Sequence, residues 1–561
     1  MKATLLYSLK FLAIIILLNA ISFGYYHRFD LTQDKRYSLT PITKNLINSL
    51  NKTLTITVYL KGDFPLEFKR LQTETQQLLQ EFSSQNNKIS FRFIDPLSHK
   101  SIGQDLIKKG LQPSKLTVQE NGEISEKVIF PWAIISYNGK KEKVNLLSNT
   151  QSNSQAQQIT EAISKLEYAF ADAFSKVATS KKQSIAVLKG NGELQDIYLD
   201  SFLRSLVGRY NLAPFTLDSV AKNPQRTLEQ LQKFDLAIIA KPTEEFTEAE
   251  KFVLDQYIMH QGKMLWLIDN VQADLDSLTK QQGEMLAYPR DLNLTDALFS
   301  YGVRLSYDLA EDLYSAKIRL ASGIVGNKTQ YQNFNWPYFP LITSKNKHLI
   351  TNQIAPVQLK FSTAIDTLKN DISKTVLLQS SLLSKKTGTP RLINLDEINT
   401  VEEASYNKGS QILGVLLTGK FKSAYKGRIK PFEFSDVKEA SLTNAMVIIS
   451  DGDIAANQIY QNKPVDLNTN YLTGEHFGNK NFLRNTVDYL LNNKDLLSLR
   501  SKTLQLRFLD KNKVIKETLF WQLLNIVLPL IILIVFGFGF NFYRKLRYSK
   551  AINISKTRTK K

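Results

Sequence analysis

A long uncharged segment near the end of the sequence constrains the rest of the chain. No charged side chain occurs in residues 519–543. About 20 consecutive apolar residues are enough for a helix to span a bilayer core. Trp521 and Tyr543 stand near the two ends, where aromatic side chains favour the membrane interface. A buried helix of a soluble domain is the alternative, but such helices are seldom apolar on every side. We therefore predict a transmembrane helix over 519–543.

A second apolar segment lies near the N-terminus. Residues 11–26 carry no charge and follow Lys2 and Lys10. This pattern fits an uncleaved signal anchor or a signal peptide cleaved near Ser22. We favour the anchor, with residues 1–10 as a cytoplasmic N-terminus.

The C-terminal tail, residues 544–561, is strongly basic. It contains eight Lys and Arg residues and no acidic one. Positively charged flanks stay in the cytoplasm, so we expect both termini there and residues 27–517 in the periplasm. The protein would be a two-pass protein of the bacterial inner membrane. Arg544, Lys545 and Arg547, together with Trp521 and Tyr543, are predicted to contact lipid at the interface.

The overall charge excludes some partners and chemistries. The formal net charge is +20, but about half of it falls in the two ends. The remainder is not clustered as nucleic-acid binding requires, so we expect no nucleic-acid partner. The chain has no cysteine, which excludes disulfides, thiol nucleophiles and cysteine-bound zinc.

Residues 27–150 are predicted to form an α/β domain. Thr40 and Pro41 are typical of a helix start. A strand at 54–60, a helix at 65–83 and a strand at 89–94 would make a parallel β-α-β unit. The pair Asn138-Gly139 favours a hairpin turn. We expect a thioredoxin-like sheet without the redox cysteines.

A second α/β domain is predicted for residues 181–510. Residues 151–180 would be a linker with a connecting helix, because residues 148–158 are rich in Ser, Asn and Gln. The pattern favours a doubly wound sheet with helices on both faces. We expect insertions at about 275–435. The predicted strands are 184–188, 235–240, 264–268 and 445–449, and the predicted helices are 248–261, which begins with the capping box Thr247-Glu250, and 481–491.

The usual catalytic motifs are missing from the sequence. It contains no Gly-x-x-x-x-Gly-Lys-Ser/Thr loop and no Gly-x-Ser-x-Gly elbow. The five histidines are scattered without metal-ligand spacing. We therefore expect no catalytic residues, no cofactor site and no metal site.

Polar residues follow several predicted strands of the second domain. They are Asn191, Glu193, Asp269, Asp451 and Asp453. Ligands of open α/β sheets usually bind at this edge. The alternative is that these residues satisfy turns and helix N-termini. Asp451 and Asp453 could hold Ca²⁺, although one acidic pair is a weak signal.

An aromatic run forms a second candidate patch. Trp336, Tyr338 and Phe339 alternate with prolines. Such a run is either packed against the core or part of a partner surface.

Five motifs together resemble the GldG family of gliding-motility-associated ABC transporter auxiliary proteins of Bacteroidota, over essentially the whole chain. The motifs are Arg28-x-Asp30-Leu31-Thr32 with Arg36-Tyr37-Ser38-Leu39, Gly190-x-Gly192-Glu193, Asn335-Trp336-Pro337-Tyr338-Phe339-Pro340, Ser450-Asp451-Gly452-Asp453 and Arg544-Lys545-Leu546-Arg547-Tyr548. The resemblance implies a subunit that works with a separate permease and a separate ATPase. Related proteins often carry Gly-His-Gly-Glu, where this chain has Asn191 in place of the histidine. The second domain also resembles amidotransferase-like folds, whose nucleophilic cysteine is absent here.

Three functions follow as hypotheses. The first is a non-catalytic, membrane-anchored accessory subunit of an ABC transporter. The second is an extracytoplasmic solute-binding receptor, whose small-molecule ligand the sequence does not identify. The third, a hydrolase, would need a nucleophile or metal centre that the motifs do not supply.

Overall fold

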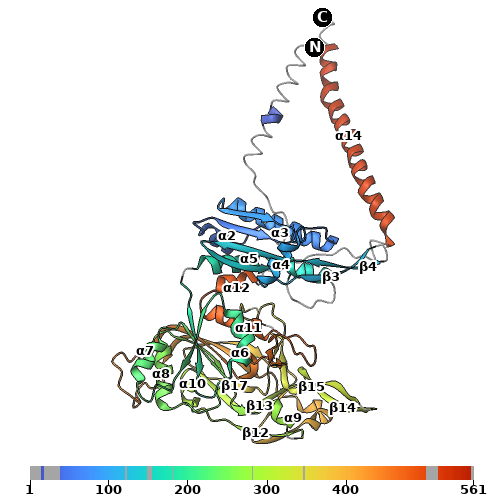
Figure 1. Cartoon of the computed structure of the whole chain (residues 1–561). Coiled ribbons are helices and arrows are strands. Elements are labelled where there is room, and N and C mark those ends of the chain that lie inside the picture. The colour runs from blue at the N-terminus through green and yellow to red at the C-terminus, as the bar shows by residue number, and fades with distance from the viewer. Residues whose placement is uncertain are drawn as a thin grey trace. The chain divides into compact units, whose positions relative to one another are not determined.

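The computed structural model divides the chain into two units, 1–502 and 503–561, which are described separately (Figure 1). It describes residues 14–17, 38–120, 123–147, 155–179, 181–280, 282–326, 328–344, 346, 348–500 and 516–556. Residues 14–17 are helical, and the rest of the predicted anchor at 11–26 lies outside the described residues.

A four-stranded sheet forms the first region. Its order is β2-β1-β5-β6, with β1 and β2 parallel and the other pairs antiparallel. The predicted β-α-β unit is therefore confirmed. Residues Asn138 and Gly139 have φ values of 48° and 78°, as a tight hairpin turn between β5 and β6 requires. The elements are α2 (Pro41–Asn48), β1 (Leu54–Val58), α3 (Leu66–Gln85), β2 (Ile89–Phe93), α4 (Lys100–Lys108), the hairpin β3 (Ser114–Glu120) and β4 (Glu123–Ile129), β5 (Trp132–Tyr137) and β6 (Lys140–Asn145).

Helix α5 (Gln155–Ala178) belongs to the first region as well as connecting it to the second. Its Phe170 and Phe174 rings lie 5.9 Å and 5.2 Å from the Phe82 ring of α3. It also contacts α2 and α12 (Lys494–Arg500). Ala171 of α5 packs there against Leu496 and Leu499 of α12.

A seven-stranded sheet forms the second region, in the order β18-β21-β22-β10-β9-β7-β8. The strands from β22 to β8 are parallel, while β21 and β18 are antiparallel additions. Both additions lie inside the predicted insertion at 275–435, so that segment contributes to the main sheet. The strands are β7 (Ser184–Lys189), β8 (Asn211–Thr216), β9 (Leu236–Ala240), β10 (Lys263–Leu267), β18 (Ser373–Gln379), β21 (Ile412–Lys422) and β22 (Ala440–Ile449).

Helices cover both faces of this sheet. Phe202 of α6 (Asp196–Leu206) and Leu483 of α11 (Asn479–Leu490) share one buried cluster with strand residues. Leu228 of α7 (Pro224–Leu231) and Phe252 of α8 (Glu248–Met259) share the cluster on the opposite face. The predicted capping box of Thr247 and Glu250 opens α8. Strands covered on both faces are apolar throughout, which explains the fully buried β9.

Smaller sheets occupy most of the remaining insertion. Their orders are β11-β12-β20, β17-β13-β19 and β14-β15-β16, with the pair β23-β24 further along the chain. The elements are β11 (Val271–Gln272), α9 (Leu275–Lys280), β12 (Glu284–Pro289), α10 (Thr295–Ser300), β13 (Val303–Asp312), β14 (Ser315–Val325), β15 (Lys328–Ile342), β16 (Val357–Gln358), β17 (Thr363–Thr367), β19 (Ser384–Thr387), β20 (Arg391–Asn394), β23 (Ile459–Tyr460) and β24 (Lys463–Pro464).

The described part of the second unit, residues 516–556, forms the long helix α14 (Thr518–Lys556). Its Thr518–Arg547 portion contains an 18-residue stretch with a mean hydropathy of 2.7. Within the described part of the chain it is the one helix long and apolar enough to cross a membrane. The predicted interface residues lie along it: Trp521 donates to Glu517 at 3.0 Å, and the Arg547 guanidinium lies over the Tyr543 ring.

Candidate functional site

Four charged residues meet where the parallel strands end. Asp269 follows β10, Asp451 and Asp453 follow β22, and Lys241 follows β9. The Lys241 Nζ atom lies 2.6 Å from Asp453 Oδ2 and 3.5 Å from Asp269 Oδ2. We call these four residues the sheet-edge cluster. Three of them were predicted from the sequence, and Lys241 was not.

Backbone amides donate to three further carboxylate oxygens of this cluster. Asp269 Oδ1 accepts from the Gly452 N–H at 2.5 Å. Asp451 accepts from the N–H groups of Asp453 and Lys360, each at 2.7 Å. The cluster therefore ties the strand ends to the chain that follows β22.

The protonation of the cluster follows from burial and from the single lysine. Burial raises the pKa of Asp269 and, together with the neighbouring carboxylates, that of Asp451. Burial also acts to raise the pKa of Asp453, but Lys241, Lys360 and Arg290 together outweigh it and lower this pKa. Burial would lower the pKa of Lys241, yet the two carboxylates raise it. A lysine held charged in this way is a poor nucleophile and fills the place between the acids that a cation would take.

Asn191 and Glu193 form a separate loop. The Asn191 carbonyl accepts from the N–H groups of Thr243 and Glu244 at 2.9 Å and 3.0 Å. Glu193 Oε2 accepts from the Asn191 N–H at 2.8 Å, and burial raises the pKa of Glu193. Among the described residues no hydrogen bond or ion pair joins this loop to Asp269, Asp451 or Asp453. The predicted edge residues thus fall into two groups.

The aromatic run is packed inside the protein. Trp336, Tyr338 and Phe339 are all buried in one cluster. The Trp336 and Tyr338 rings are 5.1 Å apart, and the Tyr338 hydroxyl donates to Glu397 at 3.0 Å. Of the two alternatives, the structure shows core packing and not a partner surface.

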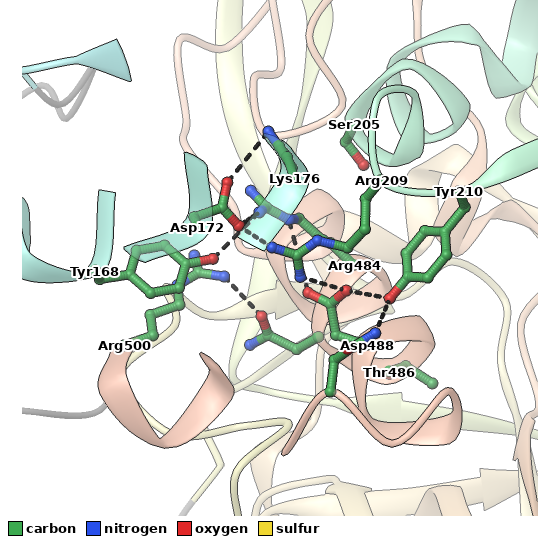
Figure 2. A network of polar contacts seen from close by, with 12 residues as sticks. Tyr168, Asp172, Lys176, Ser205, Arg209, Tyr210, Arg484, Thr486, Asp488 and Arg500 are labelled. Atoms are coloured by element: carbon green, nitrogen blue, oxygen red, sulfur yellow. Dashed lines mark hydrogen bonds and ion pairs between the residues drawn. The ribbon is translucent and has the colours of Figure 1, made fainter. Parts of the chain in front are cut away.

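A second charged cluster joins α5 to the large sheet region (Figure 2). Asp172 of α5 is 8% exposed and forms ion pairs with Arg209, Arg484 and Lys176. The Arg484 pair is 2.9 Å long and the Lys176 pair 3.1 Å. Although burial opposes it, the two guanidinium groups lower the pKa of Asp172.

Asp488 of α11 completes this second cluster. It is 1% exposed, lies 2.9 Å from Arg209 Nη1 and accepts from the Tyr210 hydroxyl at 2.6 Å (Figure 2). The Asn493 amide donates to the same hydroxyl at 2.8 Å. Burial and the Asp488 carboxylate raise the pKa of Tyr210.

We call Asp172, Arg209, Arg484 and Asp488 the junction cluster, because they fix the large sheet region to α5. The sequence analysis did not predict this cluster. The i, i+4 pairs Asp172–Lys176 and Arg484–Asp488 are visible in the sequence, but nothing in the sequence shows that the two pairs lie together.

A mixed α/β body followed by a long apolar helix defines a membrane-associated protein. The chain belongs to the auxiliary family of the ABC-type uncharacterized transport system, whose profile matches residues 182–486, more than half of the chain. A domain of unknown function, DUF7088, matches residues 33–136. The protein is thus an auxiliary component of an ABC-type transport system and associates with other components of such a system.

The chain is also similar to two other proteins. An uncharacterized protein of Borreliella burgdorferi (strain ATCC 35210 / DSM 4680 / CIP 102532 / B31) is 22% identical over 523 residues, which cover 91% of this chain and 92% of that protein. The solved mmIFT52 N-terminal domain is 12% identical, with a TM-score of 0.30, and the match covers 58% of this chain and 100% of that domain. A structural likeness this low carries no argument.

Proposed function

We propose that this protein is a non-catalytic accessory subunit of an ABC transporter that acts in gliding motility. Its extracytoplasmic domains would couple to a separate permease and a separate ATPase. Family membership supports the transporter part, and the resemblance of the five motifs to gliding-motility proteins supports the rest.

The observation that carries this proposal is the position of the first and last helices of the body. Helix α2 is the first complete helix of the described chain, and α12 is the last helix described before α14. Both contact α5, and they contact each other. The chain therefore enters and leaves the body at one place, as anchoring by two neighbouring membrane helices requires.

The topology we propose has residues 11–26 and 519–543 as the two spans. Both termini are cytoplasmic and the bulk of the chain is periplasmic. The basic tail supports this orientation. The first sheet has the strand order of thioredoxin-like folds, and the parallel strands of the second support an amidotransferase-like fold.

The absence of catalysis is also part of the proposal. At the sheet edge, where an α/β enzyme would hold its reactive groups, the carboxylates are engaged by Lys241 and backbone amides. Coupling would be mechanical and would pass through α5 and the junction cluster.

Co-purification tests the partners. The full-length chain is tagged at Lys561 and extracted from native membranes in mild detergent, with untagged membranes as the control. Near-stoichiometric recovery of a permease and an ATPase, with residues 1–10 still attached, is the expected result. Recovery of the chain alone, beginning after Ser22, would contradict it.

The lack of cysteine permits a direct test of topology. Ile429 is 95% exposed, so Ile429→Cys supplies one reactive thiol on the body. Lys561→Cys supplies one in the tail. A membrane-impermeant maleimide added to spheroplasts should label the first variant at once and the second only after permeabilisation. The reverse pattern would rule out the proposed orientation.

A further inference from the structure

A cavity of about 270 Å³ lies beside the sheet-edge cluster. Its walls come from β14, from the segment 358–360 and from the loop that follows β22. Asp453 lines it on one side. Phe339, Leu467 and Phe477 supply an apolar lining and are themselves buried. The cavity therefore sits at the edge where open α/β sheets usually receive ligands.

Three cationic side chains line this cavity: Lys317, Arg319 and Lys360. Among the described residues none of the three has an ion-pair partner within 4.0 Å. Arg319 donates to the Leu472 carbonyl at 3.2 Å, and its guanidinium lies 5.2 Å from the Tyr331 ring centroid. These contacts orient the Arg319 side chain but leave its charge uncompensated.

The acidic residues near the cavity are engaged or exposed. Asp453 is paired with Lys241 at 2.6 Å. Glu475 accepts from the Lys317 N–H at 3.0 Å and from the Thr473 hydroxyl at 3.2 Å. Asp276 lines the cavity from the exposed side of α9. The lining itself therefore holds three cations and two carboxylates, those of Asp276 and Asp453, and Lys241 already pairs with Asp453.

Hydrogen bonds hold the walls in place. Asp451 fixes the Lys360 backbone to the sheet edge. The Asn479 side-chain amide donates to the Gln358 carbonyl at 2.8 Å, and its Oδ1 accepts from the Gln358 N–H at 2.9 Å. A cavity with fixed walls loses little freedom when a ligand enters, which favours binding.

We propose that this cavity binds a small organic anion, a carboxylate or a phosphate ester with an apolar portion. The negative group would meet the three cations, and the apolar portion would rest against Phe339 and Phe477. The volume is at the lower limit of ligand pockets, which favours a small molecule. This proposal does not depend on the accessory role, because an accessory subunit and a receptor could both hold such a ligand.

Binding of three probes tests the chemistry. Purified full-length protein in detergent is titrated with phenyl phosphate, benzyl alcohol and inorganic phosphate, by calorimetry and by thermal unfolding. A ligand that binds the folded state raises its unfolding temperature. Phenyl phosphate should bind at least tenfold more tightly than either of the others, since only it combines charge with an apolar ring. Equal affinity for phenyl phosphate and benzyl alcohol would overturn the proposal.

Matched variants locate the site. Lys317→Met with Lys360→Met should weaken phenyl phosphate binding at least tenfold. The control Lys328→Met removes one lysine charge from an exposed position of the β14–β15 hairpin outside the cavity, and should leave binding unchanged. The unfolding temperature without ligand shows that each variant is folded. Unchanged binding in the double variant, or equal loss in Lys328→Met, would show that the anion binds elsewhere. Neither result bears on the recovery of a permease and an ATPase.

Discussion

The sheet-edge cluster and the junction cluster both consist of buried charged residues. The first links loops of one sheet, whereas the second links α5 to the large sheet region. At the sheet edge one lysine meets three aspartates, all from loops of a single sheet. At the junction two arginines meet two aspartates, and Asp172 comes from a helix that packs on the other sheet. The first group closes an edge, whereas the second connects two regions.

The balance of charge differs in the same way. The sheet edge has more acids than bases, so burial pushes protons onto Asp269 and Asp451. The junction has at least as many bases as acids, so Asp172 is held ionised. The junction should therefore be the stronger structural link and the sheet edge the more sensitive to pH.

Breaking the junction should have the largest effect. Asp488→Asn leaves Arg209 and Arg484 buried with one carboxylate fewer, and removing one partner of a buried ion pair costs about 3–5 kcal/mol. Urea unfolding measures the loss, and hydrogen exchange should show faster opening of α5 and α11. Asp200→Asn, which removes an exposed pair with Arg204, should cost less than about 0.5 kcal/mol. Similar losses in both variants would refute the assigned role of the junction.

Breaking the sheet edge should cost less. Lys241→Met leaves Asp269 and Asp453 without their cation, but these carboxyls can take up protons, so we expect about 2–3 kcal/mol. Faster exchange should appear at the ends of β10 and β22 and not in α5. The control is Lys422→Met, whose pair with Asp371 is exposed and should matter little. Faster exchange in α5 would mean that the two clusters are not independent.

A substitution at Gly452 tests how closely the sheet edge is packed without changing its charge. A Cβ at Gly452 would lie 2.6 Å from the Lys241 Cβ and 2.9 Å from its Cα. Gly452→Ala should therefore displace the lysine backbone at a cost of about 2 kcal/mol. Gly388→Ala, whose nearest neighbour would be at 3.7 Å, should not destabilise the protein. An unfolding midpoint that Gly452→Ala leaves unchanged would argue against close packing here.

The two clusters should respond to pH in opposite directions. The pKa of Asp172 is lowered on folding, so its contribution is present above the unfolded pKa of about 3.9 and is lost as pH falls further. The pKa of Asp451 is raised, so its contribution is full below about pH 3.9 and declines as pH rises through the folded value. The penalty of Asp172→Asn should grow by about 1 kcal/mol or more from pH 3 to pH 6, and that of Asp451→Asn should shrink. Urea unfolding midpoints of both variants across this pH range measure the two penalties. Penalties that change in the same direction with pH would contradict the prediction.

Local signals in the sequence predicted much of the fold. The capping box of α8 and the turn at Asn138-Gly139 depend on neighbouring residues and were found directly. The acids at the sheet edge were found because parallel strands bring their ends together. Strands β18 and β21 were not assigned to the main sheet, because antiparallel pairing across a long insertion leaves no periodic signal.

Contacts between residues that are far apart in the chain could not be predicted from the sequence. Lys241 and Asp453 are 212 residues apart, and Asp172 and Arg484 are 312 apart. A lysine or aspartate in such a position looks like any surface charge until the fold brings its partner near. The sequence does not show that Trp336 is buried, because an aromatic residue suits a core and an interface equally well.

The meeting of α2 and α12 on α5 has a consequence for how such a protein could arise and be dissected. Domains whose two ends lie close together tolerate insertion into, and excision from, other chains. We therefore expect the body between residues 38 and 500 to tolerate insertion and excision as one unit. In the two-span topology that we propose, the body would sit in the connection between the spans, and a short linker could replace it without separating them.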